Sequence, residues 1–173
     1  PAINMTGNVD IADRLTLTDG MVTTNANTIT ITPTSTTAIQ SYGTTDYINT
    51  GASGNLRRYV AATGSYDFPV GNADGYQRLN LNITGGNTVT YFDCNYSNFA
   101  QSFVGIIWDG SIDYNGPILN CGGTSASSGN INPGVWTITA NSGTATYDLT
   151  LYGTNSDNEG INHTILKSSQ AAG

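Results

Sequence analysis

Apolar residues in this chain of 173 residues recur at every second position over short stretches, and none of these stretches keeps a helical period. Alternation with period two is typical of strands that bury one face, because successive side chains of a strand point to opposite sides. It is clearest over 145–151, where Tyr147, Leu149 and Leu151 alternate with polar residues. Clusters of Gly, Asn, Ser and Pro separate the stretches and favour tight turns. The pattern predicts an all-β fold of many short strands.

The first 55 residues carry the shortest stretches. Apolar pairs two positions apart recur at 9/11, 15/17 and 29/31, with polar turn residues between them. Such strands fit the rungs of a β-solenoid, in which each strand stacks on its neighbours. They also fit hairpins at the edge of a sandwich. The repeat has no fixed period, so both alternatives stay open for residues 1–55.

Residues 56–173 carry longer stretches of strand character and several turn signals. Seven or so strands are enough for a two-sheet antiparallel sandwich. We predict hairpins around 62–64 and 141–143, where turn residues separate two such stretches. Parallel pairing is not expected here, because no crossover helix is visible. The predicted organisation is a solenoid-like or hairpin segment over 1–55, followed by an antiparallel β-sandwich over 56–173.

The chain is acidic, with a formal net charge of -7. Its five basic residues are Arg14, Arg57, Arg58, Arg78 and Lys167. Binding nucleic acid requires several cations on one face, but adjacent residues such as Arg57 and Arg58 point to opposite faces of a strand. No apolar run is long enough to span a bilayer. We therefore expect no nucleic-acid partner and no membrane insertion.

The residue types that support catalysis are scarce. His163 is the single histidine and Glu159 the single glutamate, and no nucleophile-elbow pattern is present. We therefore predict that the protein is not an enzyme. One histidine and two separated cysteines do not form a zinc site, and no resident cofactor is expected. Calcium is the one candidate metal, at 109–116 or 157–160, although the aspartates there also suit turns.

The two cysteines, Cys94 and Cys121, allow one disulfide. Such a bond would tether the Gly- and Ser-rich stretch 109–133 and contribute on the order of 3 kcal/mol by loop closure. The alternative is a pair of buried thiols. The disulfide is the favoured interpretation if the protein lives in an oxidising compartment.

One pair of motifs resembles a known group of proteins. Residues 54–60 read Gly-Asn-Leu-Arg-Arg-Tyr-Val, and residues 64–71 read Gly-Ser-Tyr-Asp-Phe-Pro-Val-Gly. Together with the strand-turn-strand stretch at 15–20, they resemble a β-rich repeat module of large secreted adhesin-like or gliding-associated surface proteins of the Bacteroidetes (Bacteroidota). The resemblance implies an extracellular module, commonly cargo of the type IX secretion system. The motif residues are Leu56, Arg57, Arg58, Tyr66, Phe68, Pro69, Val70 and Gly71.

The motif also has a physical interpretation of its own. Pro69 cannot donate to a ladder and is expected at an edge or a strand end. Gly71 is expected to adopt a positive φ, and Phe68 to anchor the core. We expect Arg57 or Arg58 to reach Asp67 across the hairpin, in an exposed pair worth less than about 1 kcal/mol.

These observations favour an extracellular structural or adhesive module of a bacterial cell-surface protein or filament. The chain begins at Pro1 without an initiator Met, which fits a processed product or an excised segment. Expected partners are neighbouring modules or further copies, because unfinished sheet edges before Val9 or after Leu166 could accept or donate a strand. The alternative is a carbohydrate-binding module that stacks sugars on exposed aromatics. Its candidate residues are Trp108, Tyr114 and Trp136, although both tryptophans have apolar neighbours typical of a core.

Overall fold

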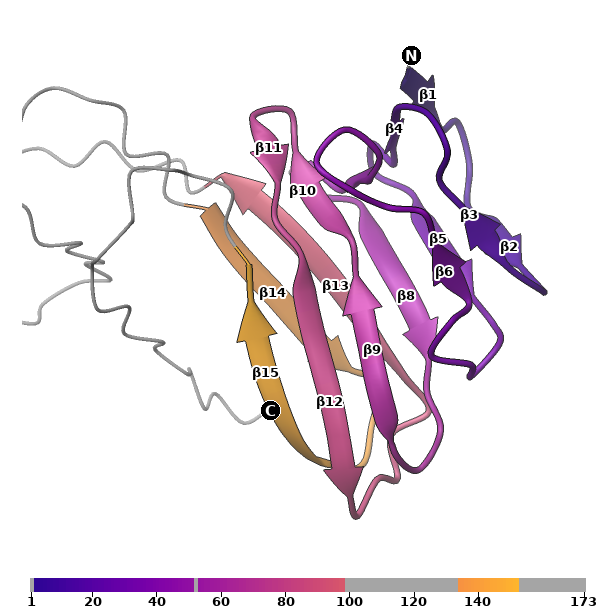
Figure 1. Cartoon of the computed structure of the whole chain (residues 1–173), viewed down its shortest axis with the longest axis vertical. Helices are drawn as coiled ribbons and strands as arrows, with labels where there is room; N and C mark the ends of the chain where they lie inside the picture. The colour runs from indigo at the N-terminus through magenta and orange to yellow at the C-terminus, as the bar shows by residue number, and fades with distance from the viewer. Residues whose placement is uncertain (1, 52, 99–133, 153–173) are drawn as a thin grey trace, which may run out of the picture. The chain divides into compact units, whose positions relative to one another are not determined.

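The structure, a computed structural model, describes residues 2–51, 53–98 and 134–152. These residues form fifteen β-strands and no helix (Figure 1). The expected all-β class is confirmed, with a solenoid-like part followed by an antiparallel sandwich.

The first part of the chain winds through successive coils, each with three short strands. Equivalent strands pair in parallel through all three coils at the first two strand positions, and between the first and second coils at the third position, so that they build separate sheets. Parallel pairing needs no helix here, because the rest of each coil serves as the crossover connection. The strands of the coils are β1 (Ala2–Asn4), β2 (Val9–Ile11) and β3 (Leu15–Thr16), then β4 (Met21–Thr23), β5 (Thr28–Ile31) and β6 (Ile39–Gln40), then β7 (Ile48–Asn49), β8 (Asn55–Tyr59) and β9 (Gly64–Phe68).

The coils differ in length, which explains why no fixed period is visible in the sequence. Along the first sheet the chain advances 19 residues from Ala2 to Met21, 26 from Val22 to Ile48 and 22 from Ile48 to Val70. The strands stay in register because the extra residues lie in the corners between them. Polar connections of variable length therefore hide a regular stacking of apolar positions.

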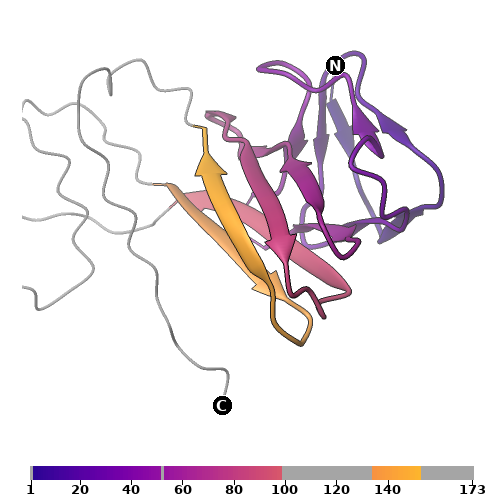
Figure 2. The ribbon, with the colours of Figure 1, turned by 60° about the horizontal axis from the view of Figure 1, so that its bottom comes forward.

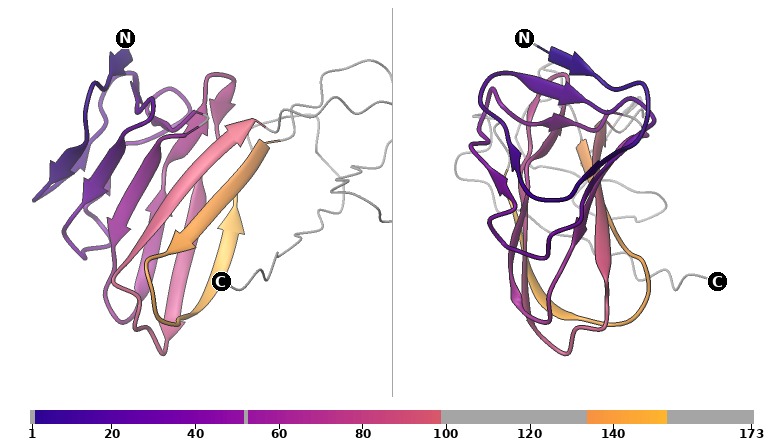
Figure 3. Two further views of the ribbon diagram at one scale, coloured as in Figure 1. Left: turned by 180° about the vertical axis from the view of Figure 1, so that it is seen from behind. Right: turned by 90° about the vertical axis from the view of Figure 1, so that its right-hand side faces the viewer.

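Two of the three sheets of the coil stack continue past the coils, whereas β6 and β9 belong to separate sheets. The remaining strands are β10 (Val70–Asn72), β11 (Gly75–Tyr76), β12 (Leu79–Gly85), β13 (Tyr91–Asn98), β14 (Gly134–Ala140) and β15 (Thr146–Leu151). One sheet runs β14-β13-β8-β5-β2, and facing it lies the sheet β15-β12-β9 (Figure 3). The predicted boundary at residue 55 coincides with the start of β8, which pairs with β5 on one side and with β13 on the other.

The predicted hairpins at 62–64 and 141–143 are wrong. β8 and β9 belong to different sheets, and so do β14 and β15. Each connection is an arch that carries the chain from one layer of the sandwich to the other (Figure 2). The β12–β13 connection, beside the β14–β15 arch, does the same. The arches at 86–90 and 141–145 are joined by a bond from the Thr88 amide to the Thr144 carbonyl, 2.8 Å long. Parallel pairs also extend beyond residue 55, as β5·β8 and β7·β10, contrary to expectation.

The core lies between the layers and inside the coils. Its fully buried side chains come from the alternating positions of the longer strands and include Leu56, Tyr66, Phe68, Leu79 and Leu81. The outward positions of the same strands carry Asn, Asp, Ser and Thr. On the β9–β12 pair, for example, Asn80 donates to Asp67 at 2.8 Å and to Ser65 at 2.9 Å. Both layers therefore hold a sealed apolar interior beneath a polar surface.

Candidate functional site

The first coil ends in an exposed apolar surface, which we call the open end and define as the outer edges of β1, β2 and β3. Along the first sheet, Ile3 is 65% exposed, whereas Ile48 and Val70 in the same column are fully buried. Along the second sheet, Val9 is 42% exposed and its partner Ile29 only 3%. Paired residues in register face the same side of a sheet. The exposure therefore arises because no coil covers the first one among the described residues.

Each strand of the first coil is also an outermost strand of its sheet in the described part of the chain. An exposed edge presents unpaired amides and carbonyls, which can pair with a further strand. Exposed charges of both signs lie here, Asp10 on β2 and Asp13 and Arg14 in the turn that follows it. The open end thus combines hydrogen-bonding groups, apolar side chains and a charged rim.

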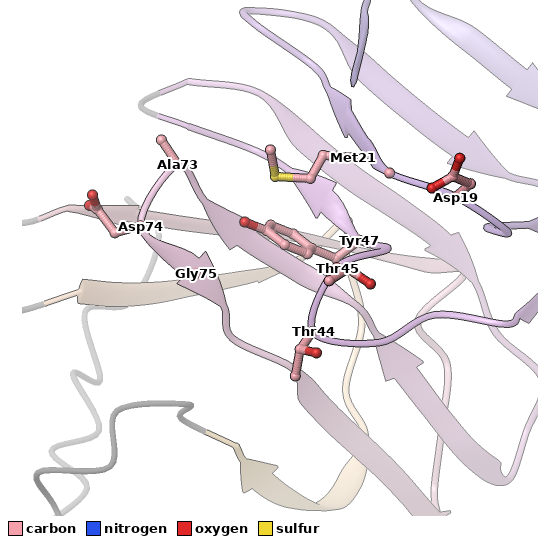
Figure 4. A pocket seen from close by; sticks show the side chains of 9 residues that line it. Asp19, Met21, Thr44, Thr45, Tyr47, Ala73, Asp74 and Gly75 are labelled. Atoms are coloured by element: carbon pink, nitrogen blue, oxygen red, sulfur yellow. The ribbon is translucent and has the colours of Figure 1, made fainter. Parts of the chain in front are cut away.

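A second feature is a shallow pocket of about 520 Å³ on the outer side of the first sheet (Figure 4). Met21 and Tyr47 lie at its centre, with Asp19 and Asp74 on opposite sides. The two carboxylates disfavour an anionic ligand. Their separation across the pocket leaves it without a compact oxygen cluster for a cation.

Hydrogen bonds hold the walls of this pocket in place. Asp46 accepts from the Gly20 amide at 2.6 Å, which links two coils. The Tyr47 hydroxyl donates to the Asn72 carbonyl at 2.7 Å, and the Asn72 side chain accepts from the amides of Asp74 and Gly75. The pocket is therefore pre-formed and large enough for one small polar group.

Arg58, one of the residues that carry the resemblance, is completely buried. Its Nη1 donates to the Asp67 carbonyl at 2.6 Å, and its Nη2 donates to the carbonyls of Ser35 and Thr36 at 3.0 and 3.3 Å. Burial lowers the pKa of Arg58 to about 10, so the guanidinium remains charged at neutral pH. Its Nε has no partner in the described part of the chain. Arg58 is thus a structural cation that joins β8, β9 and the loop after β5.

Arg57 faces the opposite side of the same strand and forms a different pair. Its Nε and Nη2 donate to the two carboxylate oxygens of Asp93 at 2.7 and 2.8 Å. Its guanidinium also lies 4.0 Å from the centre of the Tyr91 ring. The expectation that Arg57 or Arg58 reaches Asp67 is met by Arg58, which bonds to the Asp67 carbonyl from a buried position rather than in an exposed pair, whereas Arg57 bonds to Asp93.

The remaining motif residues are structural. Pro69 lies between β9 and β10, at a strand end as expected, and its carbonyl accepts from the Ile48 amide. Leu56, Tyr66, Phe68 and Val70 are fully buried. The expected positive φ at Gly71 is wrong. Glycine is required there for space, because a Cβ would collide with the Gly75 carbonyl and lie 2.7 Å from the Tyr47 ring.

One of the three candidate glycan-binding aromatics lies among the described residues. Trp136 is half-buried, packs edge-on against Tyr96 with ring centres 4.8 Å apart, and donates its indole N–H to the Gln77 carbonyl at 3.0 Å. This arrangement is typical of a core residue. Trp108 and Tyr114 lie outside the described residues.

Cys94 lies on β13 with its side chain fully buried, and burial raises the pKa of its thiol. Cys121 lies outside the described residues, so the disulfide stays a prediction. The candidate calcium segments at 109–116 and 157–160 lie outside them too, as do His163 and Glu159. Within residues 2–51, 53–98 and 134–152, no three His, Cys, Asp or Glu side chains are grouped in a way that could hold a metal ion.

Four buried or partly buried tyrosines predict a loss of stability at alkaline pH. Burial, together with the bond to Asp67, raises the pKa of Tyr42 to about 12, and burial raises the pKa values of Tyr47, Tyr76 and Tyr96. A folded-state pKa above the unfolded value of about 10 gives stability that is complete below pH ~10 and is lost as the pH rises toward ~12. The lowered pKa of Arg58 changes the stability in the opposite direction, but it involves only one group.

We therefore expect the protein to unfold between pH ~10 and ~12, with tyrosinate absorbance at 295 nm rising together with the loss of near-ultraviolet circular dichroism. The Tyr42→Phe variant should show a shallower pH dependence. Tyrosine ionisation well before unfolding would contradict this expectation.

Reasoning from the sequence missed two features of the site. The burial of Arg58 could have been predicted from the alternation of side chains along a strand, since Leu56, Arg58 and Val60 lie on the same face. The pocket could not be predicted from the sequence, because its walls come from three segments that only the stacking of the coils brings together.

Comparisons of the chain with protein-family models, with curated proteins and with solved structures give no match. Among the described residues, no helix has the length and apolar character needed to cross a membrane. The fold itself thus defines the class: an all-β chain in which a short β-solenoid-like stack continues into an antiparallel sandwich.

Proposed function

We propose that this chain is a structural module of an extracellular bacterial surface protein or filament, and that it works by contact with neighbouring β structure. The observation that carries the proposal is the open end, where Ile3 and Val9 are exposed, whereas Val22, the partner of Ile3, is partly buried and Ile29, the partner of Val9, is buried. Exposed edges with apolar side chains favour association with another strand-bearing surface.

The sealed interior supports the same role. Arg58 is held by backbone carbonyls and serves packing rather than chemistry. The polar outer faces carry cross-strand pairs such as Arg57–Asp93, which stabilise a sheet and keep it hydrated. Placement at the cell surface rests on the composition and on the resemblance of the motifs.

The proposal predicts that the isolated chain associates through the open end as its concentration rises. A variant carrying both Ile3→Lys and Val9→Lys should sediment as a monomer, since two added charges oppose apolar contact. Sedimentation velocity over a concentration series measures this. The matched control carries Thr63→Lys and Thr150→Lys, two exposed positions away from the open end, and should associate like the parent.

A glycan array separates this proposal from the carbohydrate-binding alternative. Saturable binding of a defined glycan that is lost on Trp136→Ala, in a variant that remains folded, would favour the alternative. A monomeric parent chain at all concentrations would contradict association through the open end.

A further inference from the structure

The stacking of coils within this chain indicates what covers the open end. The first coil covers the second, and the second covers the third, at the first two strand positions, whereas the third position joins only the first and second coils. The outward edge of the first coil is equivalent to the edges that the second and third coils bury. We propose that the open end binds a parallel β coil of a neighbouring module, with an apolar residue opposite Ile3 and another opposite Val9. This inference rests on the proposed structural role and adds the kind of partner.

The backbone bonds repeat from coil to coil. The Met5 amide donates to the Thr23 carbonyl at 2.9 Å, and the Thr24 amide donates to the Asn49 carbonyl at 2.9 Å. The Thr50 amide continues the series to the Gly71 carbonyl at 3.0 Å. Each accepting residue occupies the same register position in its own coil. The first coil therefore has an equivalent acceptor, the carbonyl of Asn4, which pairs in register with Thr23.

Alternation along each strand identifies the other groups at this edge. The amides of Leu15 and Leu17 bond to the second coil, so the backbone groups of Thr16 between them face the other way. The Ile11 carbonyl accepts from Thr32, and by the same alternation the groups of Asp10 face the open end. Asn4, Asp10 and Thr16 thus supply one outward-facing pair of backbone groups on each strand.

The side-chain columns set the chemistry of the partner. The column through Ile3 continues as Val22, Ile48 and Val70, and each member buries the one before it from one side. A partner coil with polar residues at these positions would leave Ile3 and Val9 against unpaired polar groups, which is unfavourable. An apolar, parallel coil in register satisfies both the side chains and the backbone.

The test adds one coil to the full chain. A second copy of residues 2–20 is inserted directly before Ala2, so that Gly20 of the copy leads into Ala2 as it leads into Met21 in the parent. The control insert has the same length but carries serine in place of Ile3, Val9 and Leu15 in the copied coil. Hydrogen exchange of individual amides is followed by NMR.

We expect exchange of the original Asn4, Asp10 and Thr16 amides to slow by at least about tenfold with the apolar insert and to be unchanged with the control. The thermal midpoint should also rise with the apolar insert alone. Equal exchange in the two insertion variants would overturn the inference. So would a symmetric dimer of the parent in which these amides are already protected, since two first coils would then pair with each other. Association of the parent without coil-specific protection would leave the structural role standing and remove only the parallel coil as its partner.

Discussion

Replacement of Arg58 by alanine is expected to lower the free energy of unfolding by about 3–5 kcal/mol. The variant loses three bonds from a charged donor to the carbonyls of Asp67, Ser35 and Thr36 and leaves a cavity between Tyr66 and Phe68. Relief of the burial of a charge offsets part of this loss. Urea denaturation monitored by circular dichroism measures the change.

Arg57→Ala is the matched control, because Arg57 neighbours Arg58 on the same strand but faces outward. Its pair with Asp93 is partly exposed, with side-chain exposures of 31% and 23%, so a loss of only about 1 kcal/mol is expected. A third variant, Arg58→Met, fills most of the volume without donating hydrogen bonds and should fall between the two. Equal losses for Arg57→Ala and Arg58→Ala would contradict the structural role of the buried guanidinium.

Gly71→Ala is expected to destabilise the protein by about 3 kcal/mol, which corresponds to a fall in the thermal midpoint of roughly 6–12 °C for a domain of this size. A Cβ at position 71 would meet the Gly75 carbonyl across the β10–β11 pair and lie 2.7 Å from the Tyr47 ring. Both neighbours are held in place, since Tyr47 is bonded to the Asn72 carbonyl and the 72–75 turn is closed by Asn72. The clash cannot be relieved by moving the end of a flexible side chain.

Gly43→Ala provides the control for this prediction. A Cβ at position 43 meets nothing within 4 Å, and its φ lies outside the left-handed region. Differential scanning calorimetry should therefore show little change for Gly43→Ala. A similar fall in both variants would contradict the clash at position 71, because Gly→Ala at an unstrained position restricts the unfolded chain and should not destabilise the protein.

The two predicted hairpins show where local chemistry stops being informative. The turn at 141–143 has the residues expected of a chain reversal, and Gly143 adopts a φ of 83°. A reversal within one sheet and an arch between two sheets use the same residues. The choice depends on which partners bury the flanking strands: β14 pairs with β13, and β15 pairs with β12. Both partners lie far away in the sequence, β13 in one layer and β12 in the other.

The sequence by itself determined that this protein is built from short strands, because the alternation of apolar and polar residues is a local property that can be recognised within each strand separately. For the first 55 residues it left stacked coils and hairpins as two alternatives. Only the tertiary structure decided which strands pair, which backbone carbonyls hold Arg58, and that the first coil keeps an uncovered apolar edge. Those features depend on contacts between coils of unequal length, and the polar corners that absorb the difference leave no periodic signal in the chain.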